Sequence, residues 1–324
     1  MRHAVQAVVL AASMAVAGHA AVAYAQNFPS KPVRFIVPFT PGAINDLLAR
    51  LIGARLAENW GQQVVVDNRA GAGTVIGTDM VAKSPPDGYT LLLVSTAFAI
   101  NTTLYPKLPY DAAKDFEPVT RVASGPFLMV VNPQLPVKSV QELVAFGKSK
   151  PGQLSYGSTG SGGTAHLIGE MFKTAAGVDI AHIPYKGLAP AMSDVISGQV
   201  SMTLGSYSTL GPQVKAGRLK ALAVTSKTRS RVAPDLPTIA ESGYPNFDAT
   251  AWWGVAVATG TPRAIIDRLN ADIVRALQSP DVRDRLSTEG ADVTPSTPAQ
   301  FAAFLNEETA KWGRVVKASG AKVD

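Results

Sequence analysis

Short apolar runs alternate with amphipathic stretches along the chain, and the two kinds of segment differ in their periodicity. Val33–Phe39 is a mostly apolar run of the kind that forms a buried strand, and a turn over 40–45 follows it. In Asp46–Trp60 the leucines recur at helical spacing, and Gly61 marks the expected end of that helix. Strands at 63–67 and 89–95 follow, with a helix at 73–83 between them. Strands separated by helices in this way predict an α/β fold with a parallel sheet covered on both faces.

A second set of elements begins near Gly125 and repeats the alternation. The helix at 139–148 opens with a capping box, which places a hydroxyl at Ser139 and a carboxylate at Glu142. The last part of the chain predicts three helices, and two of them open with Thr-Pro at Thr261 and Thr297. The remaining expected elements are strands at 127–132, 153–156, 180–184, 202–205, 219–225 and 250–257, and helices at 167–176 and 189–197.

This order of elements predicts two α/β lobes joined by two crossing strands, with a ligand cleft between the lobes. The chain passes out of the first lobe near Gly125 and returns near Asp248. Such a pair of lobes can close over a ligand by hinge motion. The expected divisions are a cleaved signal peptide at 1–25, lobe 1 at 26–125, lobe 2 at 126–247, and a return segment of lobe 1 with the C-terminal helices at 248–324.

The first 25 residues have the layout of a secretory signal peptide. A positive start at Arg2 precedes an apolar run, and Ala23-Tyr24-Ala25 offers small residues at both positions that a signal peptidase reads. The run is interrupted by polar residues and falls short of the ~20 residues that span a bilayer. The chain has no cysteine, so neither a disulfide nor a lipid-bearing cysteine is expected. We therefore expect export to a bacterial periplasm, with cleavage after Ala25.

Composition narrows the class of partner. The net charge is +6, but Lys and Arg are scattered along the sequence, so no nucleic-acid footprint is expected. A mildly positive field favours encounter with a small anion. Beyond the signal peptide the only histidines are His166 and His182, with no paired spacing, so we expect neither a metal nor another cofactor.

The glycine-rich stretch STGSGGTAH, residues 158–166, is the strongest candidate for chemistry. It lacks the lysine of a phosphate-binding P-loop, the spacing of a dinucleotide fingerprint and the G-x-S-x-G of a nucleophile elbow. A hydrolase with Ser161 as nucleophile and His166 as base is an alternative, although no acid is marked to orient the histidine. A loop whose glycines only form turns is another. We favour an anion cradle, because the hydroxyls lead directly into a helix start.

Other loops are expected to meet this one, since ligands in open α/β sheets sit at the carboxyl ends of the strands. The loops concerned are 40–45, 95–101, 158–166 and 185–189. Trp252-Trp253 raises the question of stacking on an aromatic ligand. The plainer interpretation, which we prefer, is that one indole packs in the hinge core and the other is partly exposed.

The sequence resembles the Bug family of periplasmic solute receptors, the TctC-like binding subunits of tripartite tricarboxylate transporters. The resemblance extends over nearly the whole chain after the signal peptide. It is carried by KPVRFIVPF at 31–39, VVVDNRAGAG at 64–73, PDGYTL at 86–91, LPYD at 108–111, the 158–166 loop, HIPYKG at 182–187, GQV at 198–200, AGRLKALAVT at 216–225, PT at 237–238 and GTP at 260–262.

The resemblance implies a type II periplasmic-binding-protein fold, in which two lobes close on a small organic carboxylate without catalysis. It further implies a monomeric receptor that delivers the ligand to membrane transporter subunits. A receptor that reports to a membrane sensor is an alternative, as is the secreted serine hydrolase. The ligand-binding residues implied are Phe39, Thr40, Gly42, Ala43 and Asp46 in the first loop, Ser158, Thr159, Gly160, Ser161, Gly162, Gly163, Thr164 and His166 in the glycine-rich loop, and Ser95, Thr96, Tyr185 and Gly205 deeper in the cleft.

One position departs from the family pattern. Family members usually carry two glycines after the proline of the first loop, and here Gly42 is followed by Ala43. If position 43 requires a positive φ, its Cβ costs roughly 1 kcal/mol. The ligand of a relative therefore does not transfer directly to this chain.

Overall fold

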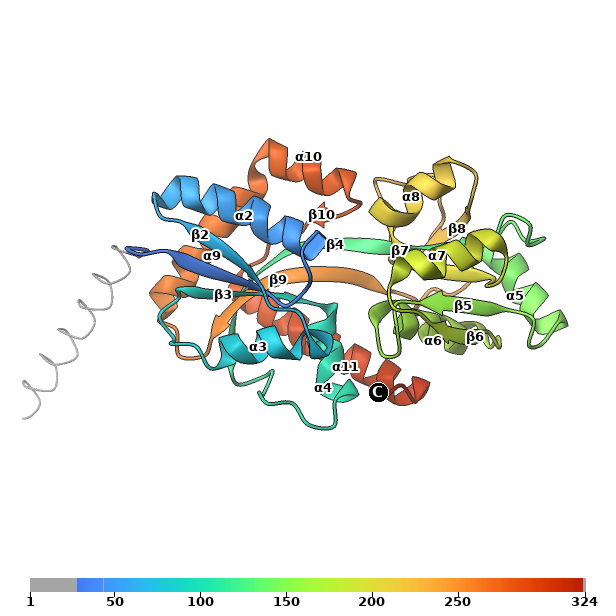
Figure 1. The fold of residues 1–324 in the computed structure, drawn as a ribbon, viewed down its shortest axis with the longest axis horizontal. Coiled ribbons are helices and arrows are strands. Elements are labelled where there is room, and N and C mark those ends of the chain that lie inside the picture. The colour runs from blue at the N-terminus through green and yellow to red at the C-terminus, as the bar shows by residue number, and fades with distance from the viewer. Residues whose placement is uncertain (1–27, 43, 323–324) are drawn as a thin grey trace, which may run out of the picture.

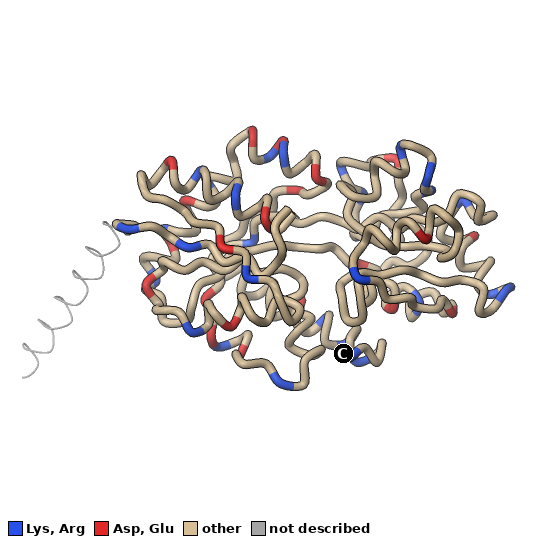
Figure 2. Tube along the Cα trace, in the orientation of Figure 1, with Lys and Arg blue, Asp and Glu red and all other residues tan. Residues whose placement is uncertain are grey.

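The computed structural model describes residues 28–42 and 44–322. The expected signal peptide and Ala43 lie outside these described residues. Figure 1 shows two α/β lobes side by side, with long strands running from one to the other. Figure 2 shows that positively charged and negatively charged residues alternate along the backbone trace of both lobes, without a large region of one sign. Among the helices of the described residues, none is long and apolar enough to cross a membrane.

The first lobe is built on a mixed sheet. Its strands β1 (Val33–Val37), β2 (Val64–Asn68) and β3 (Thr90–Ser95) pair in parallel, as the alternation of elements predicts. The strand β9 (Thr250–Ala258) then pairs antiparallel with β3, so the prediction of a parallel sheet is wrong for the crossing strands. The other elements of this lobe are α2 (Ile44–Trp60), the short helix Ala72–Thr74, α3 (Val75–Ala82), α4 (Thr96–Leu104), α9 (Arg263–Gln278), α10 (Pro280–Thr288), β10 (Asp292–Val293) and α11 (Pro298–Ser319).

The second lobe repeats the arrangement on a smaller scale. Here β5 (Ser155–Ser158) pairs in parallel with β6 (Ala181–Pro184) on one side and with β7 (Met202–Ser206) on the other. The strand β8 (Lys220–Val224) pairs with a long strand that comes from the first lobe. The helices of this lobe are α5 (Val140–Ser149), α6 (Thr164–Ala176), α7 (Leu188–Ser197) and α8 (Tyr207–Lys215).

A single strand, β4 (Phe116–Val131), connects the two sheets. It pairs with β9 as far as Pro126 opposite Thr250, and from Phe127 onward it pairs with β7. Thr225 bridges the two crossing segments at this point. Its hydroxyl accepts the Phe127 N–H at 2.9 Å and donates to the Ala249 carbonyl at 2.8 Å. The fully buried Thr225 therefore fixes both crossings to the end of β8.

Helix α11 is tied to the crossing strands by a buried polar contact. The carboxylate of Glu308 accepts the indole N–H groups of Trp252, at 2.7 Å, and Trp312, at 2.8 Å. All three residues are buried. Because an unpaired carboxylate would be costly there, these bonds fix how β9 packs on α11.

Two of the expected helix caps differ in the structure. Thr297 forms a full capping box with Gln300, but Thr261 does not cap α9. Pro262 occupies the N-cap position, and the Thr261 hydroxyl donates to the Ala258 carbonyl at 2.7 Å, within the preceding turn. At α5 the hydroxyl of Ser139 accepts the Glu142 N–H as expected. The Glu142 carboxylate, however, accepts the backbone N–H of Lys138, one residue before the N-cap, so the capping box is incomplete.

Candidate functional site

A cleft between the lobes contains two connected cavities that share Phe39, Ala97 and Thr164. We call the first the hinge chamber, because it borders the crossing strands at Pro126, Phe127 and Trp252; its volume is about 180 Å³. We call the second the loop chamber; it is lined by the glycine-rich loop and by Thr40 and has a volume of about 470 Å³. The cleft that the sequence predicts between two lobes is therefore present.

Four helices begin at the hinge chamber, two from each lobe. From the first lobe, α2 presents Ile44 and Asn45, and α4 presents Thr96. From the second lobe, α6 presents Thr164 and α8 presents Tyr207. The N-cap residues of α4, α6 and α8 make no side-chain capping bond, so the first N–H groups of these helices keep their capacity to donate. Helix starts of this kind attract anions through these N–H groups and through the helix dipole.

The helix starts at the cleft are not accompanied by a cationic side chain in the described lining. Among the described residues that line either chamber there is no lysine, arginine or histidine, and the only charged side chain is Glu289. The arrangement therefore suits an anion held by main-chain N–H groups and hydroxyls, such as a carboxylate.

The glycine-rich loop lines the loop chamber with residues 159–164. Gly160 and Gly162 have φ values of 127° and 74°, a region that glycine enters without penalty. A Cβ on Gly162 would lie 2.6 Å from Cδ2 of Leu104, a residue of α4 in the opposite lobe. Glycine is thus required here both by the turn and by the close approach of the two lobes.

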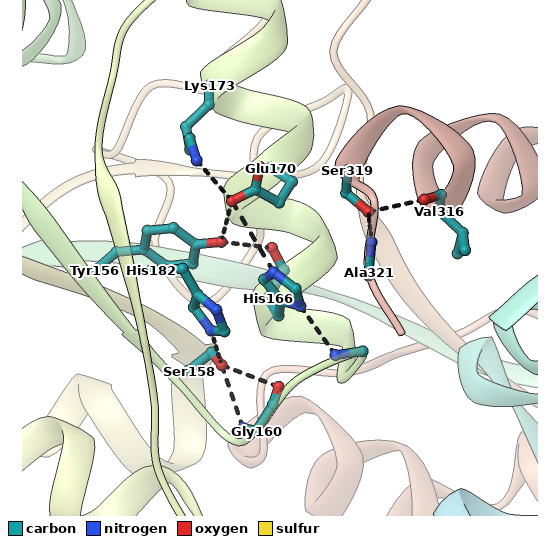
Figure 3. A network of polar contacts seen from close by, with 11 residues as sticks. Tyr156, Ser158, Gly160, His166, Glu170, Lys173, His182, Val316, Ser319 and Ala321 are labelled. Carbon is teal, nitrogen blue, oxygen red and sulfur yellow. Dashed lines mark hydrogen bonds and ion pairs between the residues drawn. The ribbon is translucent and has the colours of Figure 1, made fainter. Parts of the chain in front are cut away.

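A buried network of polar side chains lies behind this loop and holds the loop in its conformation, as Figure 3 shows. Ser158 is fully buried; its Oγ lies 2.7 Å from Nε2 of His182 and accepts the Gly160 N–H at 3.2 Å. His166 accepts the Gly162 N–H on Nδ1 at 2.9 Å, and the two imidazoles stack with centroids 3.8 Å apart. Ser158 and His166 therefore support the loop from behind, and neither lines a chamber.

The histidines of this network are neutral at physiological pH. Burial lowers the pKa of His182 to about 4, with a further contribution from the neighbouring His166. Burial also lowers the pKa of His166, against the opposing effect of Glu170. The carboxylate of Glu170 accepts the Tyr156 hydroxyl at 2.8 Å and pairs with Lys173 at 2.9 Å. A neutral His166 leaves Nδ1 free to accept the bond from the loop.

The arrangement expected of a Ser161–His166 hydrolase is not assembled in the described structure. Nδ1 of His166 is occupied by the Gly162 N–H, and Nε2 lies 4.0 Å from Glu170. The serine that does contact a histidine, Ser158, is fully buried. A nucleophile and its base must both reach the substrate, and this network does not present such a pair to the cleft.

In the first-strand loop, Asp46 acts within the loop. Its carboxylate accepts the Gly42 N–H at 3.1 Å and the Arg50 Nε–H at 2.9 Å. The hydrogen bond from Arg50 lowers the pKa of Asp46, although burial opposes it. Phe39 and Thr40 line the chambers, whereas Gly42 and Asp46 do not.

The deeper residues expected in the cleft divide into two groups. Ser95 and Thr96 line the hinge chamber, and the Thr96 hydroxyl accepts the Trp252 N–H at 3.2 Å. Tyr185 and Gly205 line neither chamber. The Tyr185 hydroxyl donates to Asp194 at 2.5 Å, which raises the pKa of Tyr185 to about 12. Gly205 lies against the side chains of Leu188 and Leu210, where a Cβ would be 2.6 Å from the former.

The sequence interpretation missed several residues that line the hinge chamber. The end of β7 and the start of α8 lie there in place of the expected loop 185–189. Since β7 is parallel to β5, the rule that ligands sit at the carboxyl ends of strands points to this junction. Glu289 carries no comparable signal, whereas Asn45 belongs to the expected loop 40–45 and Trp253 to the tryptophan pair considered for stacking. The residues missed altogether include Ser206, Tyr207, Ser208 and Glu289.

The paired tryptophans follow the plainer interpretation and also line the cleft. Trp252 is buried in the hinge core, while Trp253 is partly exposed. The Trp253 indole N–H donates to Oδ1 of Asn45 at 2.8 Å, which fixes its ring against the start of α2. Both indoles line the hinge chamber. As for metals, the described residues contain no cluster of three potential metal-ligating His, Cys, Asp or Glu side chains.

Comparison with known proteins gives a consistent result. The sequence matches the family described as "Tripartite tricarboxylate transporter family receptor" over residues 48–321. It is 41% identical to the protein BugT of Bordetella pertussis over 312 residues, which cover 96% of each chain. A solved R. palustris protein with adipate is 38% identical, with a TM-score of 0.80 over 91% of this chain and 99% of that one. MatC from Rhodopseudomonas palustris, with bound malate, is 33% identical, with a TM-score of 0.76 over 89% of this chain and 100% of that one.

Proposed function

The chain belongs to the tripartite tricarboxylate transporter receptor family and has its two-lobed binding-protein fold, and from this premise we propose its individual function. We propose that it is a periplasmic receptor that binds a small organic carboxylate between its lobes. In the closed form it delivers this ligand to the membrane subunits of a tripartite transporter. The site consists of the two chambers and the four helix starts that border them.

The observation that carries this proposal is the convergence of four helix starts on a cleft without a cationic lining. A carboxylate that is enclosed by lobe closure loses its hydration and needs several hydrogen bonds to replace it. The N–H groups at Thr96, Thr164 and Tyr207 supply such bonds from both lobes. A ligand bound to both lobes at once stabilises the closed form.

The relatives support the same class of ligand. Adipate and malate, the molecules held by the two related solved proteins, are both small carboxylates. The relatives are similar to this chain over nearly their whole length, so the comparison is between whole receptors. Family membership is also the support for export and for the transporter as partner.

Titration calorimetry on the chain from residue 26 onward tests the proposal. The panel contains mono- and dicarboxylates, each with its matching amide as control. We expect at least one acid to bind while its amide does not, because the amide carries no negative charge for the helix starts to stabilise. In a thermal-shift format, ligand at 100 times its dissociation constant stabilises the fold by about 2.7 kcal/mol. Equal binding of acid and amide, or no binding by any acid, would contradict the proposed function.

A further inference from the structure

The hinge chamber is lined by aromatic rings as well as by helix starts. Phe39, Phe127, Tyr207 and Trp253 border it, and each of the four is only partly buried. They come from four separate elements or loops of both lobes. Aromatic surface that is left partly open around one cavity indicates an apolar partner that covers it.

Two of these rings are held in place before any ligand arrives. Trp253 is fixed by its hydrogen bond to Asn45 at 2.8 Å. The ring of Tyr207 packs on Gly211, where a Cβ would be 3.2 Å from Cε1 and Cζ of the tyrosine. A pocket whose walls are already ordered loses little conformational freedom when it binds.

The size of the chamber fits a single ring. Its volume is about 180 Å³. An apolar cavity of roughly 150 Å³ is sufficient to bind benzene. The hinge chamber can therefore hold one six-membered ring with a carboxylate directed at the helix starts.

The charge of the lining argues against a second carboxylate. Glu289 is the sole charged residue of this chamber among the described residues, and it follows directly on the end of α10. Its carboxylate is paired with Arg285 at 2.9 Å, and Arg285 is not part of the lining. The negative end of the α10 dipole adds to the charge of Glu289. The ion pair with Arg285 offsets much of this charge, but a second anionic group in the ligand would meet no cationic side chain in the described lining and would be repelled by the first carboxylate.

We propose that the ligand is an aromatic monocarboxylate, with one ring seated among the aromatic residues and one carboxylate at the helix starts. This inference rests on the proposed function and narrows it to a ligand class. It differs from adipate and malate, the dicarboxylates held by the two related proteins.

Calorimetry with benzoate, terephthalate, adipate and malate tests the inference. We expect benzoate to bind at least tenfold more tightly than each of the three dicarboxylates. Tighter or equal binding of adipate, malate or terephthalate would overturn the inference and leave the proposed function in place. If no acid binds, both are contradicted.

Variants of the lining separate the contributions of charge and ring. Glu289→Gln should improve the affinity for terephthalate at least fivefold relative to the affinity for benzoate. The control Glu307→Gln, which removes an exposed carboxylate of α11, should leave both affinities unchanged. Phe127→Leu should weaken benzoate about fivefold, and Phe304→Leu, a partly buried ring outside the chamber, should not. Glu289→Gln without effect on the terephthalate-to-benzoate ratio would overturn the argument from charge. Unchanged benzoate affinity in Phe127→Leu would overturn the argument from the rings.

Discussion

Gly162 shows how a single residue connects the loop to closure of the cleft. Its backbone has a φ of 74°, and the space where a side chain would stand is filled by Leu104 of the other lobe. The residue is therefore constrained twice, by its own conformation and by a contact between the lobes. Only the second constraint bears on ligand binding.

Gly162→Ala should weaken ligand binding about tenfold, because its Cβ would lie 2.6 Å from Cδ2 of Leu104 and hold the lobes apart. Gly177→Ala is the matched control: Gly177 caps the C-terminus of α6, has a φ of 56°, and has no neighbour within 4 Å. Both variants carry a similar backbone cost of about 1 kcal/mol. Calorimetry should show a loss of ligand affinity in Gly162→Ala but not in Gly177→Ala. Adding Leu104→Ala to the Gly162→Ala variant should restore part of that affinity. Equal affinity in the two variants would contradict the contact between lobes.

The stacked histidines make stability depend on pH. The pKa of His182 is about 4 in the folded chain, against an ordinary value of 6.5. Above about pH 6.5 the ring is neutral in both states, so its packing contributes fully to stability. As the pH falls from 6.5 toward 4, the unfolded chain binds a proton that the folded chain does not, and the free energy of unfolding decreases. The groups that face it, His166, Glu170 and Lys173, influence this titration.

His182→Gln should therefore flatten the pH dependence, since glutamine can bond to Ser158 and does not titrate. We expect the native chain to lose about 1–2 kcal/mol more than the variant between pH 7 and pH 4.5, after solvent screening. Urea unfolding at the two pH values measures this difference. The same loss in both chains would show that His182 is not the responsible group.

Helix starts carry the proposed binding of the carboxylate, and they can be altered without disturbing the fold. Ser208 is the second residue of α8 and lines the hinge chamber. An acidic residue at this position interacts favourably with the dipole of its own helix, by about 0.3–1 kcal/mol. The same negative charge would repel a ligand carboxylate in the chamber, by about 4 kcal/mol at 4 Å with an effective dielectric constant of 20.

Ser208→Asp should accordingly leave the melting temperature unchanged or slightly raised while it weakens acid binding at least tenfold. Gln141→Asp is the matched control, because Gln141 is the second residue of α5, is exposed, and lies outside both chambers. Calorimetry and thermal unfolding of the pair measure both effects. Retained affinity in Ser208→Asp would place the carboxylate away from the start of α8.

Elements with a long, unbroken pattern could be predicted from the sequence, and short ones joined directly to a strand could not. The buried run Val33–Phe39 and the stripe of Asp46–Trp60 correspond to β1 and α2. In contrast, α4 and α8 begin directly where β3 and β7 end, without a loop that would signal a change of period. The sequence predicts only the last part of β4, from Phe127 onward, because Pro118, Gly125 and Pro126 interrupt the apolar pattern before it.

At the scale of the molecule, the crossing strands set how the lobes can move. Thr225 joins both crossings through two hydrogen bonds from one hydroxyl, at a fully buried position. Removal of the hydroxyl leaves the Phe127 N–H and the Ala249 carbonyl without this partner. Each buried group left unpaired costs about 1–3 kcal/mol.

Thr225→Val should therefore lower the free energy of unfolding by about 2–6 kcal/mol. Thr203→Val is the control, since this equally buried hydroxyl makes one bond, to the Gly157 carbonyl at 2.8 Å, within the second lobe. We expect a loss of about 1 kcal/mol there. Denaturant unfolding distinguishes the two, and an equal loss would mean that the Thr225 hydroxyl adds nothing to the backbone hydrogen bonds that also join Thr225 to Phe127 and Ala249.

The site as a whole could be predicted in part. Glycines and hydroxyls at 158–166 indicated an anion cradle, and residues 159–164 do line the cleft. Tyr185 and Gly205 lie away from it, whereas Trp253 and Glu289 border it. The position of Trp253 and Glu289 depends on how β9 and the end of α10 pack against the second lobe, and the local sequence does not contain that information. Ala43, the departure from the family pattern, lies outside the described residues.

The central claim, that a carboxylate is held by helix starts between the lobes, is tested most directly by a crystal structure with the tightest-binding acid of the panel. We predict carboxylate oxygens about 2.7–3.1 Å from backbone N–H groups at the starts of α4, α6 or α8. The competing location is a cavity of about 260 Å³ that borders Arg121, Lys227 and Lys311. A carboxylate bound to those cations, with the hinge chamber free of ligand, would contradict the account.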